Sequence, residues 1–254
     1  MRVLILGGTT EASALARLLA GDPRFDATFS LAGRTTMPKA QPIATRIGGF
    51  GGVEGLSQWL RGQATDAVID ATHPYADRIS ANAVAACAQT GVPLASIARP
   101  PWTPQPGDAW QIVPNAETAA AALGPAPRRV FLSLGRLDLH AFVAAPQHHY
   151  IARSVDPPQQ VALPPDMRFL QARGPFHLGA ERRLLTDEKI DVIVSKNSGG
   201  SATYPKIEAA RDLGLPVVMI ARPDKLAGHI LDGADAAIAW LEQLRAHNRS
   251  LRGV

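Results

Sequence analysis

One ten-residue pattern occurs twice in the chain, and it constrains the fold more than any other feature of the sequence. Residues 91–100 and residues 214–223 both read Gly-x-Pro-x-x-x-Ile-Ala-Arg-Pro. Upstream of the two copies, the apolar segment 66–69 corresponds to the segment 191–194. Any two segments of alternating strands and helices look alike to some degree, but a shared decapeptide in the same sequence context favours an internal duplication.

Short apolar segments alternate with helix-like segments along the whole chain. Residues 2–6 form an apolar run that ends in two glycines, which is typical of a buried parallel strand. Helical periodicity follows over 10–19, and the duplication places an equivalent of the first strand at 130–134. Alternating strands and helices predict parallel sheets that are covered on both faces. We therefore predict an α/β fold with two similar Rossmann-like domains that arose by duplication.

Two proline-rich segments suggest linkers. The segment 124–127 reads Gly-Pro-Ala-Pro and predicts a boundary between a domain at 1–125 and a second domain at 127–254. The segment 100–107 cannot be a helix or a central strand, because proline lacks the amide donor that both need. It is long enough that the strand and helix after it could dock on either domain, and the sequence leaves this open.

Composition excludes several classes of protein. With 46% hydrophobic and 19% charged residues among 254, the chain is not disordered. Its single cysteine, Cys87, excludes an internal disulfide and a multi-cysteine metal site, and we expect no bound metal. No apolar run approaches the ~20 residues of a membrane span. These features favour a cytoplasmic protein that does not bind a membrane. Its excess of four positive charges is scattered along the chain, which argues against nucleic-acid binding and suits an acidic small molecule.

The loops after the first two predicted strands suggest a nucleotide site in the first domain. Glycines followed by a helix start let backbone amides approach a pyrophosphate, although a tight turn alone would also need glycine. The predicted cofactor-binding residues of the first loop are Gly7, Gly8, Thr9, Thr10 and Glu11. After the second strand, Arg34 and Thr35 suit the 2′-phosphate of NADP, unless Arg34 is an ordinary solvated arginine. Gly51, in a glycine-rich turn, is a further candidate that could equally belong to a flexible loop.

The duplication relates two more loops, one in each domain. The first contains Thr72, His73, Pro74 and Tyr75, and it is predicted to contact the cofactor. His73 could donate a proton or hold the loop, and Tyr75 could stack on nicotinamide or cap the core. The second loop contains Lys196, Ser198, Gly199 and Gly200, which offer a point charge and backbone amides to carboxylates. We expect the two loops to lie on opposite sides of one cleft.

Further candidates for substrate binding follow strands of the second domain. Arg136 and Arg173 each come directly after a predicted strand, and arginine grips carboxylates with two hydrogen bonds, although surface arginines in turns are the plainer interpretation. Gly174 adjoins Arg173, and Tyr204 and Lys206 open the next helix. The spacing of Tyr204 and Lys206 does not fit the Tyr-x-x-x-Lys pair of short-chain dehydrogenases.

Taken in order, these motifs resemble the precorrin-6A reductase family of cobalamin biosynthesis. The resemblance runs from residue 3 to about residue 223, and the motifs that carry it lie at 5–12, 70–76, 173–176, 196–200, 206–210 and 220–223. Thr9 fits the Gly-Gly-Thr-Thr-Glu-Ala pattern of that family, although it departs from the usual dinucleotide fingerprint.

The resemblance implies an NADPH-dependent oxidoreductase that reduces precorrin-6A to precorrin-6B. A hydride goes to one carbon of a macrocycle double bond and a proton to its neighbour, with His73, Lys196 or water as the donor. Related enzymes act on the cobalt-containing macrocycle. The resemblance implies a tetrapyrrole substrate with many carboxylates, and channelling between neighbouring pathway enzymes is conceivable. A sugar-nucleotide transferase and a non-catalytic NADP(H)-binding sensor are the alternatives.

Overall fold

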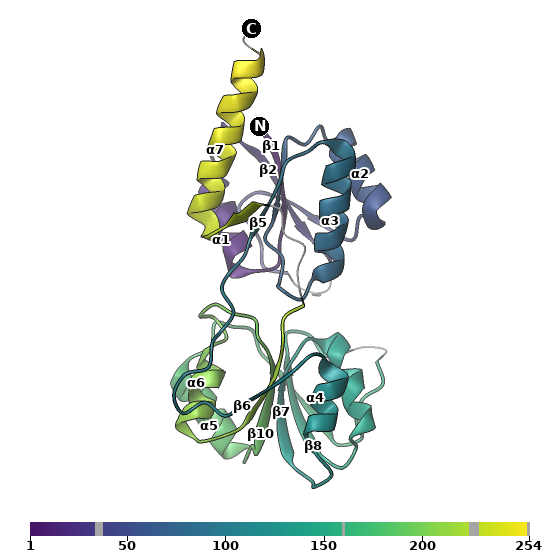
Figure 1. Ribbon diagram of the computed structural model, residues 1–254, viewed down its shortest axis with the longest axis vertical. Helices are drawn as coiled ribbons and strands as arrows, with labels where there is room; N and C mark the ends of the chain where they lie inside the picture. Colours follow the sequence, from purple (N-terminus) through teal and green to yellow (C-terminus); the bar gives the residue numbers. More distant parts are fainter. Residues whose placement is uncertain (34–37, 159–160, 224–228, 253–254) are drawn as a thin grey trace. The chain divides into compact units, whose positions relative to one another are not determined.

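The computed structural model describes residues 1–33, 38–158, 161–223 and 229–252 (Figure 1). The chain divides into two compact units. Unit 1 comprises Met1–Arg99 together with Asp224–Val254, and unit 2 comprises Pro100–Pro223. Among the described residues, no helix is long and apolar enough to cross a membrane.

Unit 1 is built on a six-stranded parallel sheet. Its strand order is β12-β5-β4-β1-β2-β3. The strands are β1 (Arg2–Leu6), β2 (Asp26–Leu31), β3 (Ala44–Ile47), β4 (Ala67–Asp70), β5 (Leu94–Ile97) and β12 (His229–Leu231). The helices are α1 (Thr10–Leu19), α2 (Gly52–Gly62), α3 (Asp77–Thr90) and α7 (Gly233–Arg252). Helices α1 and α7 cover one face of the sheet, while α2 and α3 cover the other (Figure 1).

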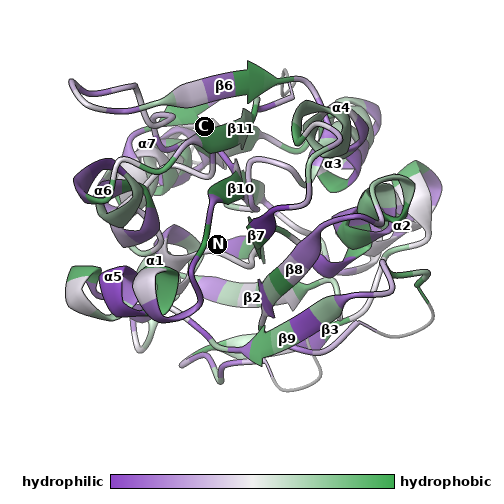
Figure 2. Cartoon of the chain, turned by 90° about the horizontal axis from the view of Figure 1, so that it is seen from below, coloured by the Kyte–Doolittle hydropathy of each residue, from purple (hydrophilic) through white to green (hydrophobic). Residues whose placement is uncertain are grey.

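Unit 2 repeats this architecture with the strand order β6-β11-β10-β7-β8-β9. The strands are β6 (Trp110–Val113), β7 (Arg129–Ser133), β8 (His149–Ser154), β9 (Met167–Gln171), β10 (Val192–Lys196) and β11 (Val217–Ile220). The helices are α4 (Ala116–Ala122), the 3-10 helix η1 (Arg136–Ala144), α5 (Leu178–Asp187) and α6 (Pro205–Asp212). The central strands β10 and β11 are strongly hydrophobic (Figure 2), as expected for strands buried on both faces.

The predicted α/β fold with two Rossmann-like units is confirmed, and the duplication extends to individual hydrogen bonds. The amide of Arg2 donates to Asp66 at 2.7 Å, and the amide of Arg129 donates to Asp191 at the same distance. The two aspartates therefore tie the start of β1 and of its counterpart β7. Two residues before each aspartate, Ala64 and Lys189 both have a positive φ, of 46° and 50°.

The predicted domain boundaries, 1–125 and 127–254, are wrong. Strand β6 follows the proline-rich segment 100–107 and pairs with β11 in the second sheet, while β12 pairs with β5 in the first sheet. Each half of the sequence thus gives its last strand and helix to the sheet of the other half. The exchange is possible because duplication made the two receiving edges equivalent. The strand and helix that follow Pro106 therefore dock on the second sheet, a point that the sequence left open.

Candidate functional site

The glycines of the β1–α1 loop in unit 1 are required by sterics. Gly8 has a φ of 125°, a conformation that side chains rarely allow. A Cβ atom on Gly7 would lie 2.3 Å from the ring of Phe29, which is buried in the core beneath the loop. The backbone can therefore turn tightly from β1 into α1, and no side chain of these two residues stands in front of the helix.

Thr9 fixes the start of α1. Its hydroxyl oxygen accepts a hydrogen bond from the amide of Ala12 at 3.2 Å and donates to the carbonyl of Ala71 at 2.7 Å. This ties the helix start to the end of β4. The amides of Thr10 and Glu11 belong to the first helical turn, where N–H groups have no partner within the helix. Together with the helix dipole, the amide of Thr10 suits an anion such as a pyrophosphate.

An acidic side chain beside this helix start is neutralised by an arginine. Nη1 of Arg99 lies 3.2 Å from both carboxylate oxygens of Glu11. Burial opposes ionisation of Glu11, but its backbone amide and the Arg99 charge outweigh burial and lower the pKa of Glu11. Arg99 belongs to the repeated Ile-Ala-Arg-Pro pattern, so its position was visible in the sequence, whereas its pairing with Glu11 was not.

The loop after β4 is held by a buried aspartate. The amide and the hydroxyl of Thr72 donate to Oδ1 of Asp70 at 3.0 and 2.6 Å, and the Thr72 hydroxyl lies 3.3 Å from that of Ser80. Thr72 is itself buried, so its side chain secures the loop from inside. The rings of His73 and Tyr75 lie 5.6 Å apart and are half-buried at the start of α3. Their predicted contact with a cofactor stays a prediction, as does that of Pro74.

Three predicted cofactor residues follow β2 and β3 in the sequence. Arg34 and Thr35 lie outside the described residues. Gly51 precedes the first residue of α2 with a φ of 84°, so its glycine is required by the start of the helix. Sequence reasoning missed Arg46, whose guanidinium donates to the hydroxyl of Ser30 at 2.8 Å and lies 3.8 Å from the ring of Phe50. Arg46 lies within a strand, where a search restricted to loops could not find it.

Unit 2 places a cation at the corresponding edge of its sheet. Nζ of Lys196, at the end of β10, lies 2.7 Å from Oδ2 of Asp138 in η1. Both side chains are partly exposed, at 17% and 25%. Asp138 was not predicted, although it follows the strand that corresponds to β1. Arg136, two residues earlier, begins η1 and is half-buried.

The loop after Lys196 has a backbone that only glycine satisfies. Gly199 and Gly200 have positive φ values of 65° and 71°. A Cβ atom on Gly199 would lie 2.2 Å from Nη2 of Arg222 and 2.3 Å from the carbonyl oxygen of Pro100. The amide of Ser198 donates to the carbonyl of Lys196 at 2.9 Å, which makes the loop turn sharply after the strand.

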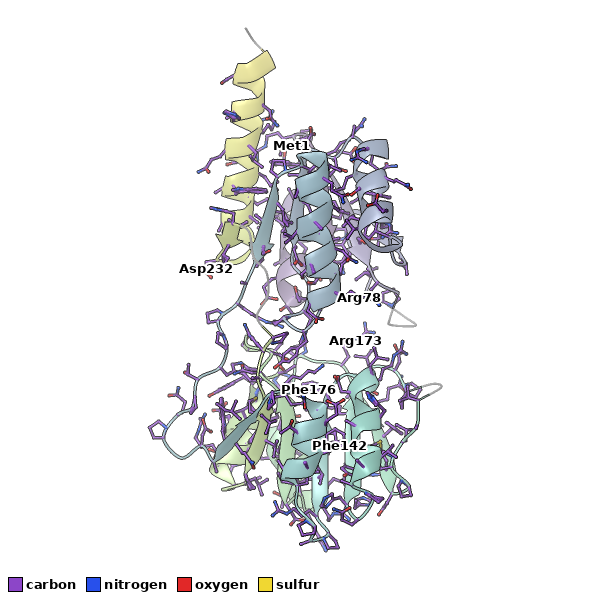
Figure 3. All side chains as sticks on the ribbon, turned by 45° about the vertical axis from the view of Figure 1, so that its right-hand side comes forward. Met1, Arg78, Phe142, Arg173, Phe176 and Asp232 are labelled. Atoms are coloured by element: carbon purple, nitrogen blue, oxygen red, sulfur yellow. The ribbon has the colours of Figure 1, made fainter. Side chains whose placement is uncertain are left out.

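The loop after β9 is joined to this one. The amide of Phe176 donates to the carbonyl of Ala202 at 3.0 Å, and its ring lies 3.6 Å from the guanidinium of Arg153. Arg173 and Gly174 are exposed at the start of the same loop (Figure 3). The predicted substrate candidates 173–174 and 198–200 thus lie on two linked loops.

Lys206 does not face solvent, and its predicted contact with substrate is wrong. The residue is 2% exposed, and its ammonium donates to the carbonyl of Thr203 at 2.8 Å. Burial, with a contribution from Arg153, lowers the pKa of Lys206 to about 7, while Glu181 opposes this shift. The reason is helix geometry: Lys206 occupies the buried side of α6, whose other members include Ile207.

Tyr204 also lies beneath the loop. Its hydroxyl accepts a hydrogen bond from Nη2 of Arg211 at 2.7 Å, and its ring lies 5.6 Å from that of Trp102. These contacts support the loop, and a substrate contact of Tyr204 stays a prediction.

The two parallel sheets and the loops at their carboxyl edges define a duplicated Rossmann-like protein. Comparison with known families gives the particular one. The sequence pattern of the family described as precorrin-6x reductase CbiJ/CobK matches residues 2–242. The chain therefore belongs to the precorrin-6x reductase family and is an oxidoreductase, as its motifs predicted.

Individual relatives agree with this assignment. Precorrin-6A reductase of Rhodobacter capsulatus is 53% identical over 253 residues, covering 100% of this chain and 99% of the relative. Cobalt-precorrin-6A reductase of Salmonella typhimurium is 31% identical over 255 residues, covering 93% and 94%. A solved structure described as CobK precorrin-6A reductase has a TM-score of 0.91 at 53% identity, covering 96% of this chain and 97% of that one.

Proposed function

We propose that the protein uses NADPH to reduce one macrocycle double bond of metal-free precorrin-6A, giving precorrin-6B in cobalamin biosynthesis. The observation that carries this proposal is the 53% identity, over the full length of both chains, to a precorrin-6A reductase. The cobalt-precorrin-6A reductase of Salmonella typhimurium is only 31% identical, which favours the metal-free substrate.

In this proposal unit 1 binds the cofactor. The helix start offers the amide of Thr10 and the positive end of the helix dipole to the pyrophosphate, and Arg99 reduces the repulsion that the Glu11 carboxylate would exert. Arg34 and Thr35 select NADPH through its 2′-phosphate. Bound nicotinamide supplies the hydride. The protein's own contribution is to hold the cofactor and to keep its reactive face oriented.

Unit 2 binds the substrate in the same proposal. Precorrin-6A carries many carboxylates, and the exposed Arg173, the half-buried Arg136 and Lys196 are cations that can bind them. Asp138 orients the ammonium of Lys196 at 2.7 Å, which suits an anchor for a carboxylate. The amides of Gly199 and Gly200 add neutral donors. Because Lys196 is engaged in this way, His73 or water is the better candidate for the proton that balances the added hydride.

The experiment is anaerobic turnover, followed by the loss of NADPH absorbance in the near ultraviolet. Purified protein is expected to consume NADPH with precorrin-6A, and NADH is expected to be much poorer. Arg34→Ala should weaken NADPH binding at least tenfold more than NADH binding, because only NADPH has the phosphate; equal losses would remove Arg34 as the selector.

Two outcomes would redirect the proposal. Turnover only with cobalt-precorrin-6A would show that the substrate is the metal-bearing macrocycle. Tight binding of NADPH without turnover of either macrocycle would favour the non-catalytic sensor. Membership of a reductase family already argues against a sugar-nucleotide transferase. A cytoplasmic location and direct transfer of substrate between neighbouring pathway enzymes belong to the same proposal.

A further inference from the structure

Two chain segments that are far apart in sequence converge on one loop of unit 2. The carbonyl of Asn197 accepts a hydrogen bond from Nε of Arg222 at 2.7 Å, just after β11. Nη2 of Arg222 also donates to the carbonyl of Pro100 at 3.2 Å, just after β5. These are the two places where the chain leaves one sheet for the other. Gly199 packs against both of them so closely that a Cβ atom has no room.

Trp102 makes the most extensive attachment between these segments and the loop. Its amide donates to Oδ1 of Asn197 at 2.8 Å, and its carbonyl accepts from Nδ2 of Asn197 at 2.9 Å. Its indole Nε1 donates to the carbonyl of Gly200 at 2.8 Å. A single residue therefore holds the loop at both ends of the turn formed by residues 197–200.

The indole is itself fixed from below. The ammonium of Lys206 lies 4.8 Å from the Trp102 ring and donates to the carbonyl of Thr203, while the ring of Tyr204 lies 5.6 Å from that of Trp102. Trp102 is only 9% exposed. The ring has little freedom to move, so the carbonyl of Gly200 is held at a defined position.

A buried indole Nε1 usually finds a partner, but filling the core does not by itself require three hydrogen bonds to one loop. Trp110 shows the contrast within the same unit, because its buried Nε1 finds no hydrogen-bond partner among the described residues. Both indoles pack against the same core cluster. Only that of Trp102 is attached to the loop that carries the predicted substrate donors.

We propose that Trp102 is a positioning residue for substrate binding, which fixes the 197–200 turn so that the amides of Gly199 and Gly200 and the ammonium of Lys196 meet one carboxylate of the macrocycle. The proposal rests on the function proposed above. The exchange of strands then has a local role, because it brings the segment with Trp102 beneath the loop that binds substrate.

The test is Trp102→Phe, with Trp110→Phe as the matched control. Phenylalanine keeps an aromatic ring but removes the bond to Gly200. We expect the KM for precorrin-6A to rise about fivefold to tenfold, the size of effect that follows from one hydrogen bond, while kcat and the Kd for NADPH change less than about twofold. Trp110→Phe should leave all three constants unchanged, since no bond is lost.

A second measurement does not depend on turnover. Hydrogen exchange in the free protein should be faster at the amides of 198–203 in Trp102→Phe than in the wild type, and unchanged there in Trp110→Phe. If Trp102→Phe alters neither the KM nor this exchange, the proposal is overturned. It is equally overturned if both variants weaken precorrin-6A and NADPH together, because that pattern reports general loosening of the fold. If the wild type reduces neither macrocycle, the proposed function fails, and unchanged exchange would overturn the inference separately.

Discussion

The buried lysine of α6 makes the stability of the protein depend on pH in a specific direction. The pKa of Lys206 is about 7, against an ordinary value of 10.5. Between these two values the unfolded chain binds a proton that the folded chain does not. The free energy of unfolding therefore rises with pH through this window, by up to about 1.4 kcal/mol per pH unit. Below the folded pKa both states are protonated, and the full cost of burying the charge is present.

The magnitude follows from the two pKa values. Integrated from about pH 6 to about pH 9, the contribution of Lys206 amounts to about 2–3 kcal/mol. Lys206→Met replaces the ammonium by an apolar group of similar length and removes this contribution. It also removes the bond to Thr203, and the change in that bond on protonation is already contained in the folded pKa of Lys206. The two proteins should therefore differ in slope, whatever their difference at one pH.

The assay is urea denaturation of both proteins at several pH values across this range. The wild type should gain about 2–3 kcal/mol more than Lys206→Met between the ends of the range. Lys39→Met, at an exposed lysine, is the control and should follow the wild type. Parallel curves for wild type and Lys206→Met would refute the reasoning, because they would mean that Lys206 binds its proton equally in both states.

Three other predictions concern stability. Glu181→Gln should lower the free energy of unfolding by about 3–5 kcal/mol in urea denaturation, because it leaves the buried charge of Arg153 without a carboxylate. In the wild type the two nitrogens of Arg153 donate to the Glu181 carboxylate at 2.5 and 2.8 Å. The double variant Arg153→Met with Glu181→Leu should lose much less, and equal losses would contradict this. His148 is buried, and burial lowers its pKa, so the unfolded state takes up a proton at a higher pH than the folded state. Below about pH 6.5 the stability of the wild type should therefore fall more steeply than that of His148→Gln. Identical acid unfolding curves for the two proteins would argue against this. Gly7→Ala should lower the free energy of unfolding by about 1–3 kcal/mol and weaken NADPH binding, because the new Cβ would lie 2.3 Å from the Phe29 ring. An unchanged melting temperature and an unchanged Kd for NADPH would show that the ring moves aside without cost.

The sequence predicted those features of the fold that depend on local pattern. The repeat around Arg99 and Arg222 indicated the duplication, and apolar segments such as residues 2–6 marked the buried strands. It could not predict the exchange of strands, because duplication gives both sheets the same kind of open edge. Which edge receives β6 depends on tertiary packing beyond the linker.

The candidate site was predictable in its backbone more than in its side chains. Glycines at 7–8 and 199–200 follow from local geometry, and the structure places them in tight turns. The prediction that Lys206 contacts substrate was wrong because a lysine near a helix start is usually exposed. Its burial depends on which side of α6 faces the sheet, and the sequence does not give that side. The ion pair of Lys196 with Asp138 joins residues far apart in the chain, so no local sequence pattern predicts it. The contacts with cofactor and substrate stay predictions.

The exchanged strands also set the order in which the protein can be completed during synthesis. Unit 2 is one continuous stretch that ends at Pro223, so all its strands are present once that residue has left the ribosome. Unit 1 begins first, yet β5 keeps an unpaired edge until β12 arrives at the far end of the chain. Until then the core around Leu15 also lacks Leu241 of α7. The first sheet to be started is thus the last to be closed, and a truncation at the C-terminus would damage the unit that contains the N-terminal glycine loop.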